Sequence, residues 1–597
     1  MQLMTTIRDV IAGTATSQTP DALEFARAQL LTCLEDSGAI VAWLSGAVGS
    51  RKSALLSAFT TAACDAAVIR VDCRNVEPTP SGVKAALCDR MNKPAADFDE
   101  LTSDISELAN RVVLIFEYYE VLRLADSWIR GELIPALDAK VRIVFSSHEP
   151  PAVGWTSAAD WQQHFKAISL PADVSIDSLS STMRLFDEIS DPDIRRALTS
   201  LSISRRITYP MITALCPEYS PEDLYEKLAA LSFLEARSDG LALSPLLQKA
   251  LSSKLQAADP DRYRELQRAA WQYLRGHLRH TVRADLWRST ADIIYLIENP
   301  VIREAFFPSE SARYSVEPAL PADHADIFNI ISRTEPDSAI EAMQLWWKHL
   351  PSAFRIIRDT TGTAVGFYCA AEPRDLFNTW MRFDPVANLW LQNLKQAPGI
   401  EKPSAIFIRR WLSIDDGESP GAIQAAAWVD IKRSYLEYRP DLRRVYLTLE
   451  DIGPYAAVAT ELGFSVIEEA TASFSGTEYY TAMLDFGPGS VDGWICNLLA
   501  AELGITEEQI LDSSSRELVS GNHRVRLTQL EFGVMAMLES HAGDAVSRGD
   551  LLRQVWGHGH EGGSNVVDAV VRGLRKKLAG SEIEVETIRG IGYRLCV

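Results

Sequence analysis

The sequence is poor in cysteine and contains no long apolar run. Its 597 residues include eight cysteines, and none of them forms a C-x-x-C pair. This spacing argues against a disulfide framework or a cysteine-based metal site. No stretch of 18 apolar residues is present, and the N-terminus lacks a basic segment followed by an apolar one. We therefore expect a cytoplasmic protein with no membrane partner.

Positive charge is also scarce, since 59 Lys and Arg residues stand against 80 Asp and Glu, a net charge of −21. From Arg516 onward the chain is nearly neutral, with eleven basic and ten acidic residues, so the preceding residues carry the negative charge. This balance excludes nucleic-acid binding through a general electrostatic surface and restricts such binding to the last domain. A hydrophobic content of 47% is that of globular protein, and the length predicts three to five domains.

A basic amphipathic helix is predicted near the C-terminus, over 564–578. Wrapped at 100° per residue, one face is apolar and the other is mainly charged. The apolar face holds Val567, Val570, Val571, Leu574 and Leu578; the opposite face holds Asp568, Ala569, Arg572, Arg575 and Lys576. Such a helix can pack on a small domain and enter a major groove.

Capping patterns place further elements around this helix. Thr528-x-x-Glu531 and Ser547-x-x-Asp550 predict two helix starts, and Asn565 with Asp568 predicts a third. The glycines in 589–593 predict a tight hairpin with Arg589 at its tip.

The segments LTQLEF, VSRGDLLRQVW, VVDAVVRGLRKKL and IRGIGYRL together closely resemble the C-terminal effector domains of OmpR/PhoB-type bacterial response regulators. The resemblance implies a winged helix-turn-helix over 515–597 that binds double-stranded DNA, with Arg589 in the minor groove. The residues expected at DNA are Asn565, Asp568, Ala569, Arg572, Arg575, Lys576, Arg589 and Tyr593. The family usually has His or Arg where Ala569 stands, so base preference should differ.

Near the N-terminus, the apolar segment AIVAWL is followed by SGAVGSRKS, which fits most of a phosphate-binding loop. The fitting residues are Gly46, Gly49, Lys52 and Ser53, while Arg51 replaces the second required glycine. A second predicted strand ends at Glu117, where Asp is usual, and a third leads to His148.

This order resembles the STAND class of signal-transducing P-loop ATPases, and the likeness covers about residues 20–308. It implies an α/β P-loop domain over 20–170, an α-helical winged-helix region over 171–308, and ATP with Mg²⁺ as ligands. Arg51, Glu117 and His148 depart from the family at three parts of the hydrolytic apparatus. A nucleotide-binding scaffold and a non-binding one both remain open, with Glu117 as a candidate catalytic residue.

A third α/β unit is predicted over 313–486, with a hairpin around 359–362 and a strand–helix–strand unit from Val445. These pieces resemble GNAT acyltransferases, which bind acyl-CoA at a helix N-terminus. Here the corresponding turn carries Asp415, Asp416, Glu418 and Pro420 before Gly421.

Acidic residues at this turn would repel an anionic cofactor, and proline removes an N–H donor. The family's general-acid tyrosine would correspond to Ala459, which leaves Tyr455 as a substitute candidate. We therefore do not expect acetyl-CoA binding and interpret this unit as a ligand-sensing or interaction domain.

Two further features are a possible metal-ligand group and a bridging helix. His558, His560 and Glu561 have metal-ligand chemistry but no further ligand pair nearby, so no metal site is predicted. GWICNLLAAELG, over 493–504, predicts a short amphipathic helix within a bridging segment, 491–511, between the body and the DNA-binding domain.

Together these patterns predict a multidomain bacterial transcriptional regulator, with sensory or oligomerising modules ahead of its DNA-binding domain and a homo-oligomer on DNA. Two alternatives stay open. One is an active NTPase or acetyltransferase tethered to DNA by the winged helix; the other is a winged helix that binds protein instead of DNA.

Overall fold

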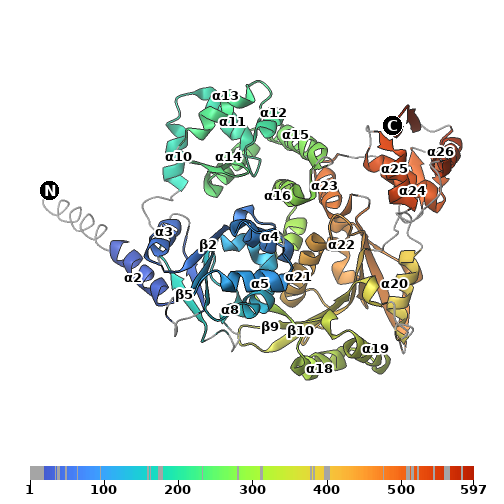
Figure 1. Ribbon diagram of the computed structural model, residues 1–597. Helices are drawn as coiled ribbons and strands as arrows, with labels where there is room; N and C mark the ends of the chain where they lie inside the picture. Colours follow the sequence, from blue (N-terminus) through green and yellow to red (C-terminus); the bar gives the residue numbers. More distant parts are fainter. Residues whose placement is uncertain are drawn as a thin grey trace.

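The computed structural model describes the chain in the following ranges: residues 19–33, 35, 40–47, 50–63, 65–94, 96–156, 161, 163–171, 179–231, 233–278, 281–308, 313–376, 380, 383–395, 404–474, 476–487, 489–505, 511–512, 516–520, 523–541, 545–556, 565–579 and 583–596. Within these ranges no helix is long and apolar enough to cross a membrane. Figure 1 shows a large body, with the C-terminal domain set to one side of it.

The N-terminal part of the body is a parallel five-stranded sheet between two layers of helices (Figure 1). The strand order is β2-β3-β4-β1-β5, so β1 lies between strands that are distant in sequence. The strands are β1 (Val41–Ser45), β2 (Ala67–Asp72), β3 (Val112–Glu117), β4 (Val141–Ser147) and β5 (Phe165–Ser169).

The helices of this part are α2 (Thr19–Thr32), α3 (Lys52–Ala62), α4 (Pro80–Arg90), α5 (Phe98–Glu107), α6 (Asp126–Trp128), α7 (Ile134–Ala136) and α8 (Val153–Thr156), with the short turns η1 (Cys73–Asn75) and η2 (Tyr119–Ala125). Both faces of the sheet are covered, which explains why the predicted strands are continuous apolar runs. The strands predicted from AIVAWL and RVVLIFE are present as β1 and β3.

A helical region follows, and one β-hairpin lies between α13 and α14. Its elements are α10 (Leu179–Asp187), α11 (Pro192–Leu201), α12 (Tyr209–Leu215), α13 (Pro221–Ala229), β6 (Leu234–Arg237), β7 (Gly240–Leu243), α14 (Pro245–Ala258), α15 (Pro260–Leu278), α16 (Leu286–Leu296) and α17 (Pro300–Phe306). Proline stands at the first turn of six of these helices, where its missing N–H is not needed.

The next part is built on a mixed sheet of order β13-β15-β12-β11-β10-β9-β8, with β14 paired to β15. Its strands are β8 (Ser315–Pro318), β9 (Phe354–Arg358), β10 (Ala364–Ala371), β11 (Ala405–Ser413), β12 (Arg444–Leu449), β13 (Phe464–Val466), β14 (Ala472–Phe474) and β15 (Thr477–Asp485). β9 and β10 form the predicted hairpin. β11 and β12 are parallel and pair only as far as Ile408 and Leu447, after which β11 continues along β10 alone.

Helices cover both faces of this sheet. α18 (His324–Thr334), α19 (Asp337–His349) and α20 (Pro385–Lys395) pack on one face, and α21 (Ala422–Tyr438) and α22 (Ala456–Leu462) on the other. The apolar cluster on the α21 face continues without interruption into the helical region. The helical region and this sheet therefore share one core, although the sequence suggested two separate units.

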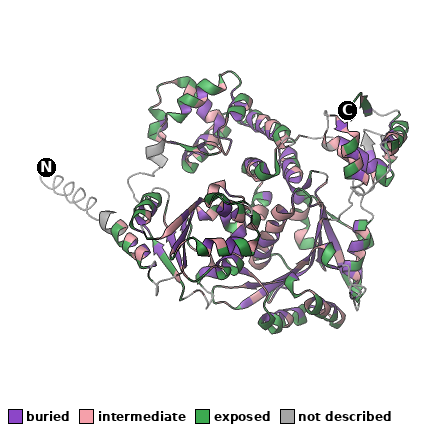
Figure 2. Cartoon of the chain, in the orientation of Figure 1, coloured by how far each residue is buried: buried purple, intermediate pink, exposed green. Residues whose placement is uncertain are grey.

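The bridging helix α23 (Ser490–Glu502) differs from its prediction. We expected an amphipathic helix, but nine of its residues are buried, and Figure 2 shows it mainly in the colour of buried residues. It packs against α15 and α16, and its apolar side chains belong to the same cluster as those of α21. This helix is therefore part of the body core.

The C-terminal domain has a small core of its own. Its elements are β16 (Leu511–Asp512), β17 (Glu517–Ser520), β18 (His523–Arg526), α24 (Gln529–Ser540), β19 (Val546–Ser547), α25 (Arg548–Leu551), η12 (Leu552–Trp556), α26 (Asn565–Lys577), β20 (Glu584–Ile588) and β21 (Gly592–Cys596). Three helices precede a hairpin, as the capping patterns predicted. The capping box of Thr528 and Glu531 is present in full, and Ser547 caps α25.

Candidate functional sites

Helix α26 is held on the C-terminal domain by the apolar face that the sequence predicted. Val567, Val571, Leu574 and Leu578 are buried, while Val570 is half-buried. On the side facing α24, a Cβ added at Gly573 would stand 3.0 Å from Oε1 of Glu531, so the two helices approach closely there. This packing directs the opposite face of α26 outward.

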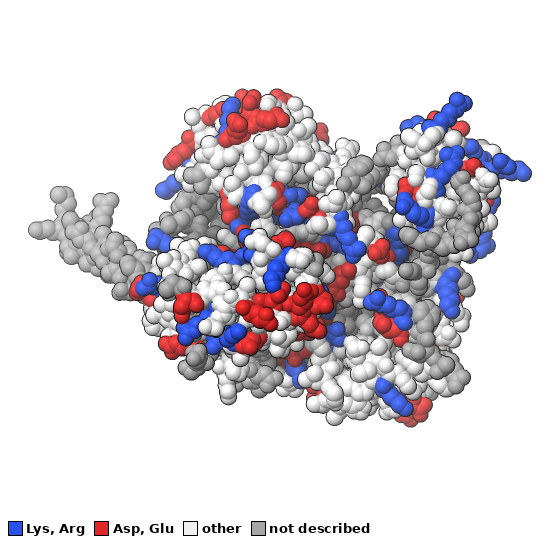
Figure 3. Space-filling view, in the orientation of Figure 1, with Lys and Arg blue, Asp and Glu red and all other residues white. Residues whose placement is uncertain are grey.

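The outward face of α26 consists of Asn565, Ala569, Arg572 and Lys576, all exposed. Within the described part of the chain, no hydrogen bond or ion pair engages the side chains of Arg572 and Lys576. Figure 3 shows Lys and Arg side chains projecting from the outer side of the C-terminal domain, whereas dense groups of Asp and Glu lie on the body. This face offers cations at the spacing of successive helical turns.

Asp568 and Tyr593, which we expected at DNA, are engaged within the domain. Nε of Arg548 donates to Oδ1 of Asp568 at 3.0 Å, and the hydroxyl of Tyr593 donates to the same carboxylate. These two hydrogen bonds hold the pKa of Asp568 below its ordinary value. Tyr593 is 4% exposed. The carboxylate therefore links α26 to α25 and β21 instead of capping the start of α26.

Arg575 also turns toward the hairpin. Its Nε donates to the carbonyl oxygen of Val585 and its Nη2 to Oγ1 of Thr587, each at 2.7 Å. We expected Arg575 at DNA, but its guanidinium fixes the hairpin to the helix. Arg589 is exposed in the turn between β20 and β21, where Gly590 has φ +78°, so its position at the tip is as predicted.

A second candidate site lies where β1, β3 and β4 end. Lys52, the first residue of α3, is buried, and its Nζ donates to the carbonyl oxygens of Gly46 at 2.6 Å and Ala47 at 3.0 Å. Burial lowers the pKa of Lys52. Ser53 is exposed beside it, and Arg51 has φ +59°, a conformation that favours glycine. Gly49 lies outside the described residues.

Glu117 stands at the end of β3, as predicted, but its carboxylate is neutralised by Arg70 of β2. Nε and Nη2 of Arg70 donate to Oε1 of Glu117 at 3.0 and 2.7 Å. A carboxylate in such a pair is poorly placed to bind a metal ion. This contact weakens the case for Glu117 as a catalytic residue.

The sequence reasoning missed Glu120, which the structure places beside His148. Nδ1 of His148 lies 3.0 Å from Oε1 of Glu120, and the backbone N–H of His148 donates to Oε2 at 3.2 Å. Burial acts to raise the pKa of Glu120, but hydrogen bonds from His148 and from the backbone of Glu120, together with the electrostatic attraction of His148, lower it overall. Tyr118 has φ +57°, and this turn of the backbone separates Glu120 from the strand end. The three-residue spacing from Glu117 was the only sequence signal.

A third polar cluster lies where β11 and β12 separate. Arg410 is fully buried and pairs with Glu335 at 2.5 Å and with Glu418 and Glu450. Oε1 of Glu418 accepts the backbone N–H groups of Glu450 and Asp451, each at 2.8 Å. Glu418 therefore bridges the ends of the two strands, while Asp415 and Asp416 are exposed.

Tyr455 is also part of this cluster. Its hydroxyl donates to the backbone oxygen of Glu418 at 2.5 Å, and its ring lies 5.6 Å from that of Trp411. Burial raises the pKa of Tyr455 far above its ordinary value. Its contacts are those of a packing residue that holds the loop after β11, which argues against the role of general acid.

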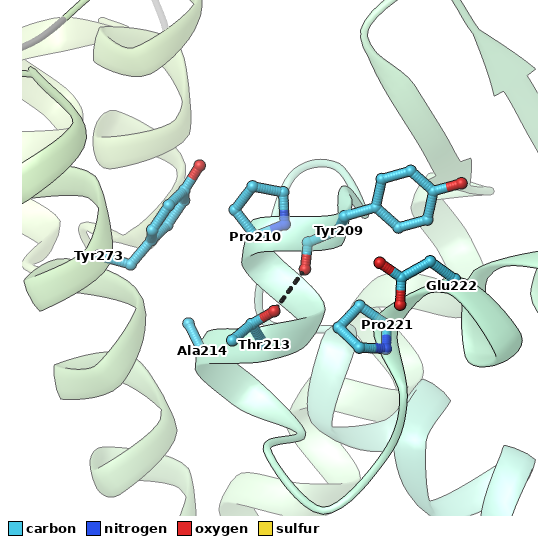
Figure 4. A pocket seen from close by; sticks show the side chains of 7 residues that line it. All are labelled: Tyr209, Pro210, Thr213, Ala214, Pro221, Glu222 and Tyr273. Carbon is cyan, nitrogen blue, oxygen red and sulfur yellow. Dashed lines mark hydrogen bonds between the residues drawn. The ribbon is translucent and has the colours of Figure 1, made fainter.

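Metal-ligand groups and pockets are the other features that could form a functional site. Among the described residues no group of three or more His, Cys, Asp or Glu is arranged to hold a metal; His558, His560 and Glu561 lie outside them. A pocket of about 400 Å³ opens on the helical region (Figure 4). It is lined by Tyr209, Pro210, Thr213, Ala214, Pro221, Glu222 and Tyr273, with one carboxylate among largely apolar groups.

Comparison with known proteins bears on the C-terminal domain. The family model "Transcriptional regulatory protein, C terminal" matches residues 522–595. Transcriptional regulatory protein VxrB of Vibrio cholerae is 36% identical over 91 residues, which are 15% of this chain and 36% of that protein. Transcriptional regulatory protein CssR of Bacillus subtilis is 35% identical over 94 residues, 16% of this chain and 41% of that protein.

A solved structure, the DNA-binding domain of Bacillus subtilis CssR, is 40% identical; the match covers 14% of this chain and 97% of that one, with a TM-score of 0.14. The chain thus spans about two fifths of the length of the curated relatives it matches. The matched residues show that the C-terminal domain is a winged-helix DNA-binding domain of OmpR/PhoB type.

Proposed function

We propose that this chain is a sequence-specific transcriptional regulator in which the acidic body controls a C-terminal DNA reader. The observation that carries the proposal is the outward face of α26, where Arg572 and Lys576 are exposed and form no ion pair with any residue that the structure describes. Cations held on a packed helix neutralise phosphate and contact base edges in a major groove. VxrB and CssR are both transcriptional regulatory proteins, and this similarity supports the same function for this chain.

The five-stranded sheet supports a nucleotide as the ligand of the body. β1 leads through the Gly46 loop into α3, a helix of 11 residues whose N-terminus favours phosphate. Lys52 fits such a ligand because its buried ammonium already donates hydrogen bonds to oxygen atoms, the carbonyl oxygens of Gly46 and Ala47. When bound, a magnesium nucleotide would supply a charged phosphate chain that competes with the carbonyls of Gly46 and Ala47 for Lys52.

The same site argues against efficient hydrolysis. Glu117 is paired with Arg70, and Arg51 places a side chain where a phosphate-binding loop needs close backbone approach. We propose nucleotide binding with a signalling role, and the alternative of an active NTPase predicts steady phosphate release from ATP by the purified chain. Lys52→Met should abolish the rise in melting temperature on adding Mg·ATP, with Lys84→Met, an exchange on helix α4 away from the loop, as the matched control.

Residues around β11 and β12 resemble an acyltransferase unit but do not fit acyl-CoA. Glu418 joins the separated strand ends and Arg410 binds three carboxylates, so the cofactor's path is occupied by the protein's own side chains. We propose a scaffold or sensory role for this unit. Heat released on titrating acetyl-CoA into the chain would contradict that role and favour the acetyltransferase alternative.

The central experiment is a genome-wide selection of DNA fragments bound by the purified full chain, repeated with Mg·ATP. A shared sequence among bound fragments, lost in Arg572→Ala with Lys576→Ala, would support the proposal. Binding without any shared sequence, or unchanged binding by the double variant, would favour a protein-interaction role for the winged helix.

A further inference from the structure

Helix α23 is the last helix of the body before the C-terminal domain. The indole N–H of Trp271 donates to the carbonyl oxygen of Cys496 at 3.0 Å, and that of Trp494 donates to Leu462 at 2.8 Å. At the other end, Nη2 of Arg268 donates to the carbonyl oxygen of Leu503 at 3.2 Å. β16 begins at Leu511, so residues 503–510 separate α23 from the winged-helix domain. The short separation makes α23 the part of the body nearest in sequence to the DNA reader.

The first turn of α23 is bound by a buried arginine from another module. Arg439, at the end of α21, is 2% exposed, and its Nη1 donates to Oδ1 of Asp492 at 3.2 Å and to Oγ1 of Thr290 at 3.3 Å. Thr290, on α16, also donates to Asp492. One buried guanidinium thus joins α21, α16 and α23.

The other terminal nitrogen of the Arg439 guanidinium contacts the five-stranded domain. Nη2 donates to Oε1 of Glu77 at 2.6 Å. A guanidinium has its donors fixed in one plane, so it can bind carboxylates from two domains at once. Four parts of the chain meet at this side chain, which we name the Arg439 junction: Glu77, Thr290, Arg439 and Asp492.

Glu77 follows strand β2, and the end of β2 lies beside the candidate nucleotide site. β2 ends at Asp72, beside Glu117 of β3, and η1 follows directly. Arg74 of η1 pairs with Asp72 at 2.7 Å and covers the ring of Tyr118 at 3.6 Å. A Cβ added at Gly82 would lie 2.3 Å from the carbonyl oxygen of Glu77, so α4 packs tightly against this segment. Asp72 and Glu77 thus lie on one tightly packed segment that begins beside Glu117.

We propose that the Arg439 junction couples the occupied state of the five-stranded sheet edge to the position of α23, and through it to DNA binding. The inference rests on the proposed function, in which a nucleotide acts at that edge. Withdrawing Glu77 would leave the buried Arg439 with one carboxylate partner, and such a loss is unfavourable.

Other contacts join the same modules without touching α23. The hydroxyl of Ser127 donates to Oδ1 of Asp430 at 3.1 Å, and Nη1 of Arg130 donates to Oε1 of Glu317 at 2.6 Å. These contacts should keep the modules together when Glu77 is altered. Ser127→Ala is consequently a matched control, because it removes an interdomain hydrogen bond outside the junction.

The test compares Glu77→Gln and Ser127→Ala with the unaltered full chain. DNA affinity is measured by fluorescence anisotropy with and without Mg·ATP, and hydrogen exchange is followed over 490–503. Allosteric couplings are about 5–150-fold in affinity. We expect a response of that size in the unaltered chain and in Ser127→Ala, a response below about twofold in Glu77→Gln, and faster exchange in the first turn of α23 in Glu77→Gln.

A full Mg·ATP response in Glu77→Gln, or unchanged exchange over 490–503, would overturn the junction. Asp492→Asn removes the other arm and should give the same loss of response. If the unaltered chain shows no response to Mg·ATP, nucleotide control fails. The junction is then tested by hydrogen exchange over 490–503 and by the DNA affinity of Glu77→Gln without nucleotide. If Glu77→Gln changes neither the exchange nor the affinity, the junction is overturned.

Discussion

The outer face of α26 and the cluster around Arg410 contain the same kinds of charged residue in opposite circumstances. Arg572 and Lys576 are exposed and form no ion pair within the described part of the chain, while Arg410 is fully buried and binds Glu335, Glu418 and Glu450. Exposed cations lose little by exchanging water for phosphate, whereas a buried pair must be kept intact. The difference separates a surface that can bind a partner from a cluster that holds a fold.

Replacing Arg410 should have the largest effect on stability. Arg410→Met keeps the apolar stem but leaves three carboxylates without their cation, and we expect unfolding of the body to become easier by about 3–5 kcal/mol. Urea denaturation followed by tryptophan fluorescence measures this change. The equivalent Arg572→Met should stay within about 0.5 kcal/mol of the unaltered chain. Equal losses of stability in both variants would contradict the difference between the two sites.

Removing the two exposed cations of α26 should have the opposite profile. Arg572→Ala with Lys576→Ala should weaken DNA binding by about 2–4 kcal/mol and reduce its salt dependence, with stability unchanged. Anisotropy titrations at several salt concentrations measure both quantities. Arg196→Ala, an exposed arginine on the body, serves as the control and should bind DNA normally.

Arg575 provides an intermediate case, since it lies on α26 but is engaged with the hairpin. Arg575→Ala removes hydrogen bonds to Val585 and Thr587, and the C-terminal domain should lose about 1 kcal/mol of stability. Hydrogen exchange of β20 and β21 in the full chain reports this loss. Tighter protection of the hairpin in the variant would show that the contacts are not stabilising.

The smallest expected effect concerns pH. Burial raises the pKa of Glu450 to about 7 from its ordinary 4.5, so the folded chain holds this proton more tightly than the unfolded chain. The resulting stability is complete below about pH 4.5 and is lost as pH rises toward 7. In Glu450→Gln this part of the pH dependence should disappear, which melting temperatures between pH 5 and 8 would reveal. An identical profile in the variant would assign the dependence to other groups.

Local patterns predicted most elements that carry the candidate sites. The strand ending at Glu117, the hairpin around residues 359–362, and α24 with its capping box all depend on residues close in sequence, so periodicity and turn chemistry were sufficient. α23 was predicted as an amphipathic helix, and its burial could not be inferred because its partners, α15, α16 and α21, are distant in the chain.

Side-chain roles followed the same division. The exposed cations of α26 were predicted from helical spacing, because outward direction follows from the position of the apolar face. Asp568, Arg575 and Tyr593 were expected at DNA, but the hairpin and Arg548 engage them, and only the packed domain brings those groups together. Glu120 was missed because its relation to His148 depends on neighbouring strands.

The sequence by itself determined a winged-helix reader at the C-terminus, a nearly neutral charge on that domain and a strongly acidic body, since these are properties of local pattern and composition. The tertiary structure alone decided which charged side chains face solvent and which are engaged in ion pairs or hydrogen bonds. Packing placed Lys52 against loop carbonyls, joined Glu77 to Asp492 through Arg439, and buried α23. The physical reason is that a buried charge must find a partner, and in a folded chain that partner comes from wherever the backbone returns.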